Sequence, residues 1–405
     1  MINIIKGLVI LTVAGSLKTS GQISDSVSIS GFAHNIIHIT GDNFDDLNFL
    51  KAEIQNKRIV LLGESSHTIS DYYLLKTKII KFLHQQCHFD VLAMECGMAD
   101  TYTTSLQFDT ITSSQMMKDV LYANQSCNEM KPLFEYMKNA TKKRLQFYGF
   151  DSQDHGSSLS FIKSLLQPHY GNTADSLVNN LQKYNQTATL AWQTDKRPVT
   201  MLADTILSSA IQLINMLQTV KSNLLDEGKI TMMHFKFLER SLINHKEALN
   251  INWENENPLE RRDSLMAENI FWLANEIFPD KKIIIWGHNT HIDKGGTDAI
   301  NKSMGYYIHK KLKTDAYHIG LYAKSGSLFW WWTKDIRTFN NIQANDIENI
   351  SDLFPVTFIS VSNKYKLLNT PLMGYEAEFG RKVSFVPAKR YDAIINFRNV
   401  RAVSY

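Results

Sequence analysis

The sequence predicts an α/β protein with a mostly parallel central sheet flanked by helices and an inserted all-helical cap subdomain. Short apolar runs rich in β-branched residues are each followed by a segment of helical period, which is typical of a parallel sheet with covering helices. Between residues 156 and 255 the strand pattern is absent, and the sequence reads as helices with short polar breaks. We therefore expect an α/β catalytic core over residues 23–155 and 256–405 and a helical insertion, or cap, over residues 156–255.

The first strand and helix show the pattern most clearly. The run Arg58–Leu62 predicts a strand, and a turn over residues 63–68 follows it. One buried helical face then follows at three- and four-residue spacing, formed by Tyr72, Leu75, Ile79 and Phe82. Further strands are expected at Asp90–Met94, Leu145–Tyr148, Lys282–Trp286, Tyr317–Tyr322 and Val356–Val361.

The insertion and the helix after it carry their own signals. One helical face of the insertion is traced by Leu202, Ile206, Ala210, Leu213, Leu217, Val220 and Leu224. The next helix is expected to begin with Asn257 as its cap and Pro258 in its first turn, and to run to about Phe278 before Pro279. The core therefore resumes with a well-delimited helix.

Charge and cysteine content exclude some classes of protein. Lys and Arg number 43 and Asp and Glu 40, and the net charge of +3 is spread along the chain without basic blocks. We therefore expect no nucleic-acid partner. Cys87, Cys96 and Cys127 have no metal-ligand spacing and cannot all pair, which disfavours a disulfide framework.

The N-terminus resembles a short export signal. Residues 1–22 contain one lysine, Lys6, before the apolar run Leu8–Ala14, and then a small and polar stretch, so we expect a periplasmic or secreted protein. The alternative is an N-terminal helix of a cytoplasmic protein. The apolar run is too short to span a bilayer, so no integral membrane association is expected.

Ionisable side chains gather where the predicted strands end. Loops from several parallel strands meet at the carboxyl edge of such a sheet, and ligands bind there. The groups expected at that edge are Glu64, His67, Glu95, Asp151, His288 and His291. Each one alone fits a structural role, but together they predict a water-accessible site.

The helix that begins at Pro258 adds an arginine to this set. Arg262 and Asn269 fall on an otherwise apolar helical face. A buried arginine needs a partner, and we expect Asp151 or Glu95 to be that partner in preference to a substrate carbonyl. Asp263 is expected to be a charge of the first helical turn.

Other motifs favour less specific interpretations. The aromatic run Phe329–Trp332 could line an apolar pocket, but a strand buried on both faces is the favoured interpretation. Ser65 and Ser66 lack the Gly-x-Ser-x-Gly elbow of serine hydrolases. The spacings Glu64-x-x-His67 and His288-x-x-His291 favour metal ligation only on a helix, and here both lie in turns.

With these residues in view, the chain resembles the erythromycin esterase family. The resemblance rests on short blocks in the family's order, namely Leu62–His67, Met94–Cys96, Tyr148–Gln153, Arg262–Asn269 and Gly287–His291. A Ser303–Gly305 segment and a closing strand at Tyr391–Ile394 are also similar to the family's. The match extends from about residue 45 to the C-terminus.

The resemblance implies a carboxylic ester hydrolase that opens the lactone of a macrolide antibiotic such as erythromycin, which would inactivate it. It implies no metal and no organic cofactor. Carried over by position, His67 would be the general base, Glu64 and Glu95 would hold the imidazole and the attacking water, and His288 would stabilise or protonate the departing oxygen. The residues implied to bind substrate or support these groups are His291, Arg262, Asp151 and Asn289. The expected partner is a small macrolide or another ester.

Two other functions fit the same residues. One is a metal-dependent hydrolase of another ester or amide, with ligands from Glu64, His67, Glu95, His288 and His291. The other is a non-enzymatic protein that binds a haem-like ligand through axial histidines.

Overall fold

The computed structural model describes the chain from residue 31 to the C-terminus, with short gaps. The residues described are 31, 33–139, 143–153, 157–194, 203–249, 257–295, 302–340, 343–361 and 366–405. The predicted signal-like residues 1–22 lie outside this part of the chain. None of the described helices is long and apolar enough to cross a membrane.

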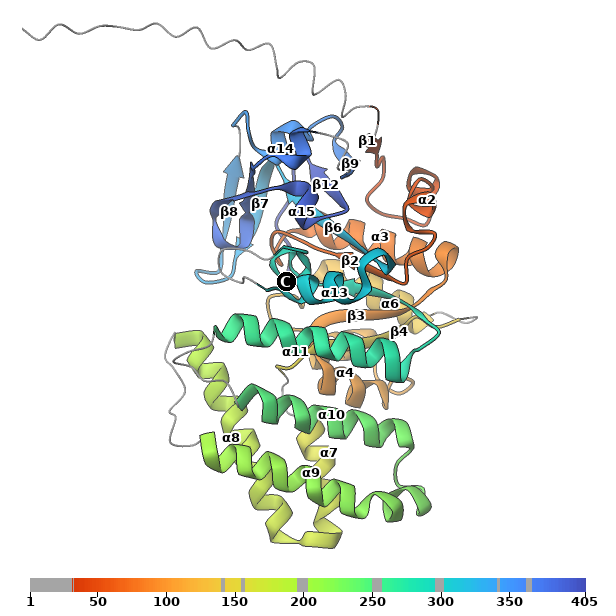
Figure 1. Cartoon of the computed structure of the whole chain (residues 1–405), viewed down its shortest axis with the longest axis vertical. Coiled ribbons are helices and arrows are strands. Elements are labelled where there is room, and N and C mark those ends of the chain that lie inside the picture. Colours follow the sequence, from red (N-terminus) through yellow and green to blue (C-terminus); the bar gives the residue numbers. More distant parts are fainter. Residues whose placement is uncertain are drawn as a thin grey trace, which may run out of the picture.

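A mixed sheet of eight strands, most of them parallel, forms the centre of the protein (Figure 1). Its strand order is β1-β9-β12-β6-β2-β5-β3-β4, and β9 is the strand that runs antiparallel to its neighbours. The strands are β1 (Ala33–Asn35), β2 (Ile59–Leu62), β3 (Phe89–Gly97), β4 (Gln146–Asp151), β5 (Lys282–Trp286), β6 (Ala316–Ala323), β9 (Val356–Ser360) and β12 (Ala393–Phe397). The predicted α/β class and each predicted strand are therefore confirmed.

Helices cover both faces of this sheet because successive strand residues point to opposite sides. Val60 and Leu62 of β2 belong to one apolar core, and Ile59 and Leu61 belong to the other. The first core is covered by α2 (Leu50–Ile54), α3 (Ser70–Cys87), α5 (Ser113–Val120) and α6 (Lys131–Asn139). The second is covered by α4 (Met98–Ser105), α11 (Pro258–Trp272) and α13 (Met304–Leu312).

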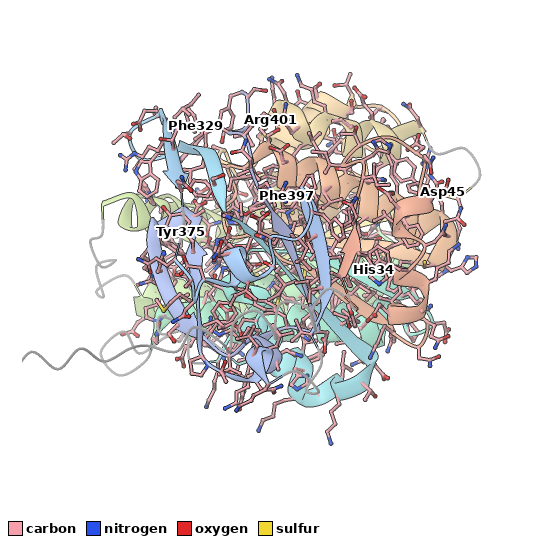
Figure 2. All side chains as sticks on the ribbon, turned by 90° about the horizontal axis from the view of Figure 1, so that it is seen from above. His34, Asp45, Phe329, Tyr375, Phe397 and Arg401 are labelled. Atoms are coloured by element: carbon pink, nitrogen blue, oxygen red, sulfur yellow. The ribbon has the colours of Figure 1, made fainter. Side chains whose placement is uncertain are left out.

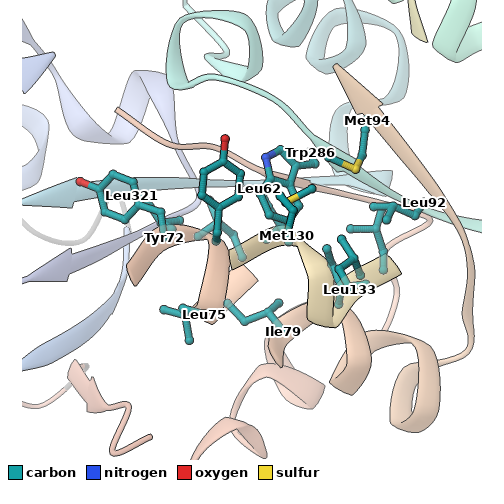
Figure 3. Packing of buried hydrophobic residues seen from close by; sticks show 14 of the residues in the cluster. Leu62, Tyr72, Leu75, Ile79, Leu92, Met94, Met130, Leu133, Trp286 and Leu321 are labelled. Carbon is teal, nitrogen blue, oxygen red and sulfur yellow. The ribbon is translucent and has the colours of Figure 1, made fainter. Parts of the chain in front are cut away.

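The predicted face of α3 is buried in the first core. Figure 3 shows Tyr72, Leu75 and Ile79 packed beneath Leu62 and Trp286 of the sheet. These side chains are all 1% exposed or less. The packing fixes the helix that follows the β2 turn, and therefore also the position of the turn itself.

The segment between β4 and α11 is helical wherever it is described. Its helices are α7 (Ser157–Tyr170), α8 (Asn172–Thr194), α9 (Ala203–Asp226) and α10 (Met232–Leu249). They share a separate apolar core, in which the predicted residues Leu213, Leu217 and Leu224 are fully buried. This bundle lies below the sheet in Figure 1, with α10 packed against α4 and α11. The all-helical character is as predicted, and the role of a cap stays a prediction.

The helix expected to follow the insertion is present. The side chain of Asn257 caps it by accepting a hydrogen bond from the backbone N–H of Leu259, 3.0 Å away. α11 ends at Trp272 and continues as a short π-helical segment, Leu273–Ile277.

Two small antiparallel ribbons stand beside the sheet near the C-terminus. They are β7 (Ser325–Trp330) with β8 (Asp335–Asn340), and β10 (Leu372–Glu376) with β11 (Arg381–Phe385). Phe329 and Tyr375, from the two ribbons, lie on the opposite side of the molecule from His34 and Asp45 (Figure 2). The prediction of a doubly buried strand at Phe329–Trp332 is wrong, because β7 forms a ribbon with β8 outside the central sheet and Trp332 is 68% exposed.

Candidate active site

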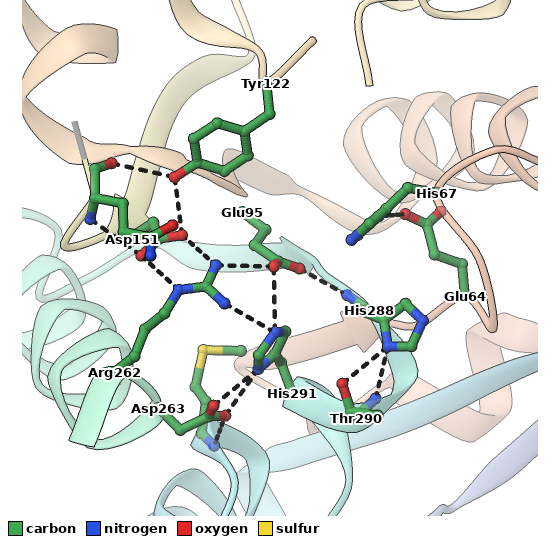
Figure 4. A network of polar contacts seen from close by, with 12 residues as sticks. Glu64, His67, Glu95, Tyr122, Asp151, Arg262, Asp263, His288, Thr290 and His291 are labelled. Atoms are coloured by element: carbon green, nitrogen blue, oxygen red, sulfur yellow. Dashed lines mark hydrogen bonds and ion pairs between the residues drawn. The ribbon is translucent and has the colours of Figure 1, made fainter. Parts of the chain in front are cut away.

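The predicted groups come together because the strands that carry them are neighbours. β2, β5, β3 and β4 are adjacent and parallel, so their carboxyl ends lie at one edge of the sheet. Glu64 and His67 follow β2, and His288 and His291 follow β5. Glu95 lies within β3 at a shift of register between Met94 and Gly97, and such irregularities re-aim side chains. Figure 4 shows all of these groups together with Asp151 and Arg262.

His67 is oriented by Glu64. Nδ1 of His67 lies 2.8 Å from Oε1 of Glu64, which is fully buried, whereas His67 is 9% exposed. Because an ionised carboxylate only accepts hydrogen bonds, Nδ1 carries the proton and Nε2 has a free lone pair. In Figure 4 the ring points this second nitrogen toward the side of Glu95 and His288.

The electrostatic surroundings favour protonation of His67. Burial by itself lowers the pKa of His67, but the hydrogen bond to Glu64 and the charges of Glu95 and Glu378 outweigh it and raise the pKa above 6.5. The imidazolium that forms when Nε2 takes a proton is therefore stabilised.

Glu64 is itself held by two groups that the sequence analysis did not identify. Nζ of Lys76 lies 2.9 Å from Oε2 of Glu64, and the indole N–H of Trp286 donates to Oε1 over 3.2 Å. Burial raises the pKa of Glu64, but the charge of Lys76 and the bond to His67 lower it below its ordinary value. Burial lowers the pKa of Lys76 to about 8, although the charge of Glu64 acts to raise it. The sequence did contain a signal for Lys76. This lysine lies four residues after Tyr72, on the buried face of α3, where a charged side chain needs a partner.

Glu95 is the centre of a second network. Its Oε2 accepts a hydrogen bond from the backbone N–H of His288 over 2.9 Å. Its Oε1 lies 3.1 Å from Nη2 of Arg262 and 3.3 Å from Nε2 of His291. Burial opposes ionisation of Glu95, but His291, His67 and Arg262 lower its pKa well below the ordinary value. The ionised form of Glu95 is therefore favoured.

Arg262 joins Glu95 to Asp151. Its guanidinium forms a bidentate contact with Asp151. Nε of Arg262 lies 3.1 Å from Oδ1 of Asp151, and Nη2 donates to Oδ2 of the same carboxylate. Tyr122 donates to the same carboxylate over 2.9 Å. The expected pairing of Arg262 with Asp151 or Glu95 is thus present with both acids.

His291 is clamped between two carboxylates. Its Nδ1 lies 2.9 Å from Oδ2 of Asp263, and its Nε2 faces Glu95. Burial alone lowers the pKa of His291, but the charges of Asp263 and Glu95 raise it to about 10. His291 is therefore a fixed cation near neutral pH. The expectation for Asp263 as a helix-terminal charge is wrong, since Asp263 is fully buried and also accepts from the backbone N–H of Met304 over 2.7 Å.

His288 has the opposite character. Burial and the nearby His67 and His291 lower its pKa well below 6.5, so the ring is neutral. The backbone N–H of Thr290 donates to Nδ1 over 3.2 Å, which leaves the proton on Nε2. Among the described residues no hydrogen bond of ordinary geometry reaches this buried Nε2, although the Ser65 carbonyl lies nearby. His288 and His67 stand side by side, with ring centroids 5.2 Å apart.

Asn289 connects the site to the sheet. Its side chain donates to the carbonyl of Leu321 over 2.8 Å and accepts from the Leu321 N–H over 3.2 Å. A side chain on Gly63 would collide with Oδ1 of Asn289, so this approach of the two loops requires glycine. These bonds leave Asn289 positioned as a loop anchor.

A further acid reaches the site from far along the chain. Oε2 of Glu378 accepts from the backbone N–H of His67 over 2.9 Å and from the Ser66 hydroxyl over 2.7 Å. Its own backbone N–H donates to the Ser65 carbonyl over 2.8 Å. Nothing in the sequence near residue 378 indicates this contact, which depends on how the C-terminal ribbons fold back.

The described residues contain no cluster of three or more His, Cys, Asp or Glu side chains arranged to hold a metal ion. The chemical reason is that Glu64, Glu95 and His291 already direct their donor atoms at protein partners. The metal-ligand interpretation of these residues therefore has no ready ligand set in this part of the chain.

Comparisons with known proteins show the family to which the chain belongs. The erythromycin esterase family model matches residues 84–400. A Bacillus subtilis (strain 168) protein, YbfO, whose name assigns it only provisionally to the hydrolases, is 32% identical over 306 residues, which cover 70% of this chain and 68% of YbfO. The type II erythromycin esterase of Escherichia coli is 23% identical over 275 residues, which cover 62% of this chain and 65% of the esterase.

A solved structure shares the fold. The erythromycin esterase EreC, in the open conformation of a point mutant, superposes with a TM-score of 0.67 at 15% identity, covering 91% of this chain and 98% of EreC. On the extent of the family match, this chain belongs to the erythromycin esterase family.

Proposed function

We propose that this protein hydrolyses a carboxylic ester, and that the ester is the lactone of a macrolide or a similar cyclic ester. Membership of the family supports hydrolase activity, and one relative is named an erythromycin esterase. The observation that carries the chemistry is the Glu64–His67 pair, in which a buried carboxylate holds Nδ1 over 2.8 Å and leaves Nε2 free.

In the proposed reaction, His67 acts as general base. Nε2 takes a proton from a water molecule as the water oxygen attacks the ester carbonyl carbon, and Glu64 stabilises the resulting imidazolium. Such catalysis contributes roughly 10²–10⁴-fold. The imidazolium then returns the proton to the departing alkoxide, so that ester and water become acid and alcohol.

His288 is suited to stabilise the oxyanion that forms in the first step. A neutral imidazole with its proton on a buried Nε2, which has no hydrogen bond of ordinary geometry among the described residues, is a preorganised hydrogen-bond donor. Its position is set by Glu95, which accepts from the His288 backbone N–H. Since Glu95 stays ionised, its proposed contribution is to hold His288 and to stabilise positive charge on His67, and not to exchange protons.

The remaining residues of the site have supporting roles in this proposal. Arg262, Asp151 and His291 keep Glu95 in place and balance its charge. Asn289 anchors the loop that carries His288. An N-terminal export signal would place the enzyme outside the cytoplasm, where it would meet an antibiotic on entry.

The test is hydrolysis of erythromycin by the purified chain, followed by mass spectrometry. We expect product heavier by one water from the parent protein and none from His67→Ala, while Ser65→Ala, which leaves the Glu64–His67 pair intact, retains activity. Activity of His67→Ala within a few-fold of the parent would contradict the general-base role.

The same preparation tests the alternatives suggested by the sequence. Stoichiometric metal by elemental analysis, with turnover lost on chelation, would favour a metallohydrolase. A Soret absorption band without hydrolysis of any ester would favour a haem-binding protein.

A further inference from the structure

Aromatic side chains form an exposed surface beside the site. We define the aromatic rim as Phe379, Trp330, Trp331 and Tyr405. Phe379 is 51% exposed and Tyr405 is 49% exposed, and the neighbouring Trp332 is 68% exposed. Soluble proteins rarely leave adjoining large apolar groups in water without a binding role.

The rim begins at the proposed reacting groups. The ring of Phe379 lies edge-on to that of His288, with centroids 5.7 Å apart. Phe379 belongs to the same turn as Glu378, whose bonds to Ser65, Ser66 and His67 fasten this turn to the loop of the general base. Phe379 is therefore held in a fixed relation to both histidines.

The β7–β8 ribbon continues the rim outward. A side chain on Gly380 would contact the Trp330 ring at 3.5 Å, and the backbone N–H of Phe329 donates to the carbonyl of Thr68 over 3.3 Å. Tyr405 packs against Phe329 and Trp331, with ring centroids 4.9 and 5.7 Å apart. The apolar surface thus continues from His288 to the ribbon.

Cations of the chain itself already pair with the rings of the rim. Arg381 lies 5.4 Å from the centroid of Phe379, Arg337 4.2 Å from that of Trp330, and Lys334 2.9 Å from that of Trp331. Arg381 and Arg337 are also paired with Glu376 and Asp335. A positively charged ligand group would therefore find these cation–π sites occupied and the nearby carboxylates already paired. The chemistry of the rim therefore favours a neutral apolar ligand.

We infer that the aromatic rim binds the neutral apolar part of the substrate next to the ester carbonyl, with Phe379 as the contact nearest the reacting atoms. This inference rests on the proposed ester hydrolysis and adds a specificity determinant to it. Glu378 is then a positioning residue that couples the rim to His67.

The test is a series of p-nitrophenyl esters with acetate, butyrate, hexanoate and octanoate chains. Each methylene group that becomes buried on the rim should raise kcat/KM by about fourfold in the parent protein. Phe379→Ala should flatten this dependence and raise KM for octanoate by about tenfold. Ile211→Ala, which removes an exposed apolar side chain on α9 far from the site, is the matched control and should behave as the parent.

Charge preference gives an independent readout. An octanoate-length ester with a terminal trimethylammonium group should be hydrolysed at least tenfold less efficiently than its neutral tert-butyl analogue. An equal dependence on chain length in the parent and Phe379→Ala would overturn the inference, as would a preference for the cationic ester.

Binding without turnover separates the rim from the reaction. The change in tryptophan fluorescence on addition of 2-decanone, a ketone with an octyl chain and no scissile bond, should report binding to the parent that weakens about tenfold in Phe379→Ala. If no ester is hydrolysed and this loss is still seen, the proposed function fails and the rim stands. If both proteins bind 2-decanone equally, the rim is overturned, whatever the hydrolysis result.

Discussion

Lys76 and Glu64 form an ion pair of 2.9 Å in which both side chains are fully buried. Nζ of Lys76 also lies 4.0 Å from the ring centroid of Trp286, whose indole N–H bonds to the same carboxylate. A buried carboxylate stays ionised only with such compensation. Glu64, which orients His67, is therefore held both by Lys76 of α3 and by Trp286 of the central sheet.

Lys76→Met should destabilise the fold strongly. It leaves the charge of Glu64 buried without its cation, and breaking a buried pair in this way costs about 3–5 kcal/mol. Urea unfolding measures the loss. The double variant Glu64→Gln with Lys76→Met buries no charge at this pair, so its unfolding free energy should lie closer to the parent's than that of Lys76→Met. Additive losses would show that the two residues are not coupled.

Glu64→Gln should reduce kcat by roughly 10²–10⁴-fold with little change in KM. A glutamine amide can donate to Nδ1 of His67, which would favour the tautomer that carries its proton on Nε2 and blocks the base. Steady-state kinetics on any ester that the parent hydrolyses provides the measurement. Glu348→Gln, the same replacement at a fully buried glutamate outside the Glu64–His67 pair, is the control. Unaltered turnover in Glu64→Gln would remove the proposed role of the pair.

The acid limb of the kcat/KM profile should have its midpoint above pH 6.5. The base must be unprotonated to act, and Glu64, Glu95 and Glu378 raise the pKa of His67 above that value. Activity therefore rises with pH through the raised pKa. Because Glu378 contributes to this shift, Glu378→Gln should move the midpoint to lower pH. A midpoint that moves upward instead would contradict the assignment of the limb to His67.

Asp263→Asn should lower stability in a pH-dependent way. The pKa of His291 is raised to about 10 in the fold, against 6.5 ordinarily, so its charge stabilises the fold fully below pH 6.5 and this contribution is lost as pH rises to about 10. Removing the negative charge of Asp263 lowers that pKa. The difference in unfolding free energy between parent and variant, on the order of 2–3 kcal/mol near pH 6.5, should therefore shrink toward pH 10. A constant difference across this range would exclude the ion pair as its cause.

The sequence by itself determined most strands of the central sheet, the α/β class and the convergence of Glu64, His67, Glu95 and His288. Each of these groups lies in or just after an apolar run, and parallel neighbouring strands bring such positions to one edge of a sheet. Local periodicity was sufficient for this part, and it also indicated that Arg262 needed a buried acid.

Only the tertiary structure decided which partner each ionisable group has. Asp263 faces His291, and Glu378 reaches His67 across more than three hundred residues of chain. The aromatic run at Phe329–Trp332 is partly exposed in the structure, because β7 pairs with β8 in a separate ribbon and is not a strand of the central sheet. The physical reason is that periodicity encodes which face of an element is buried, whereas pKa values and hydrogen-bond pairs depend on atoms brought together from distant segments.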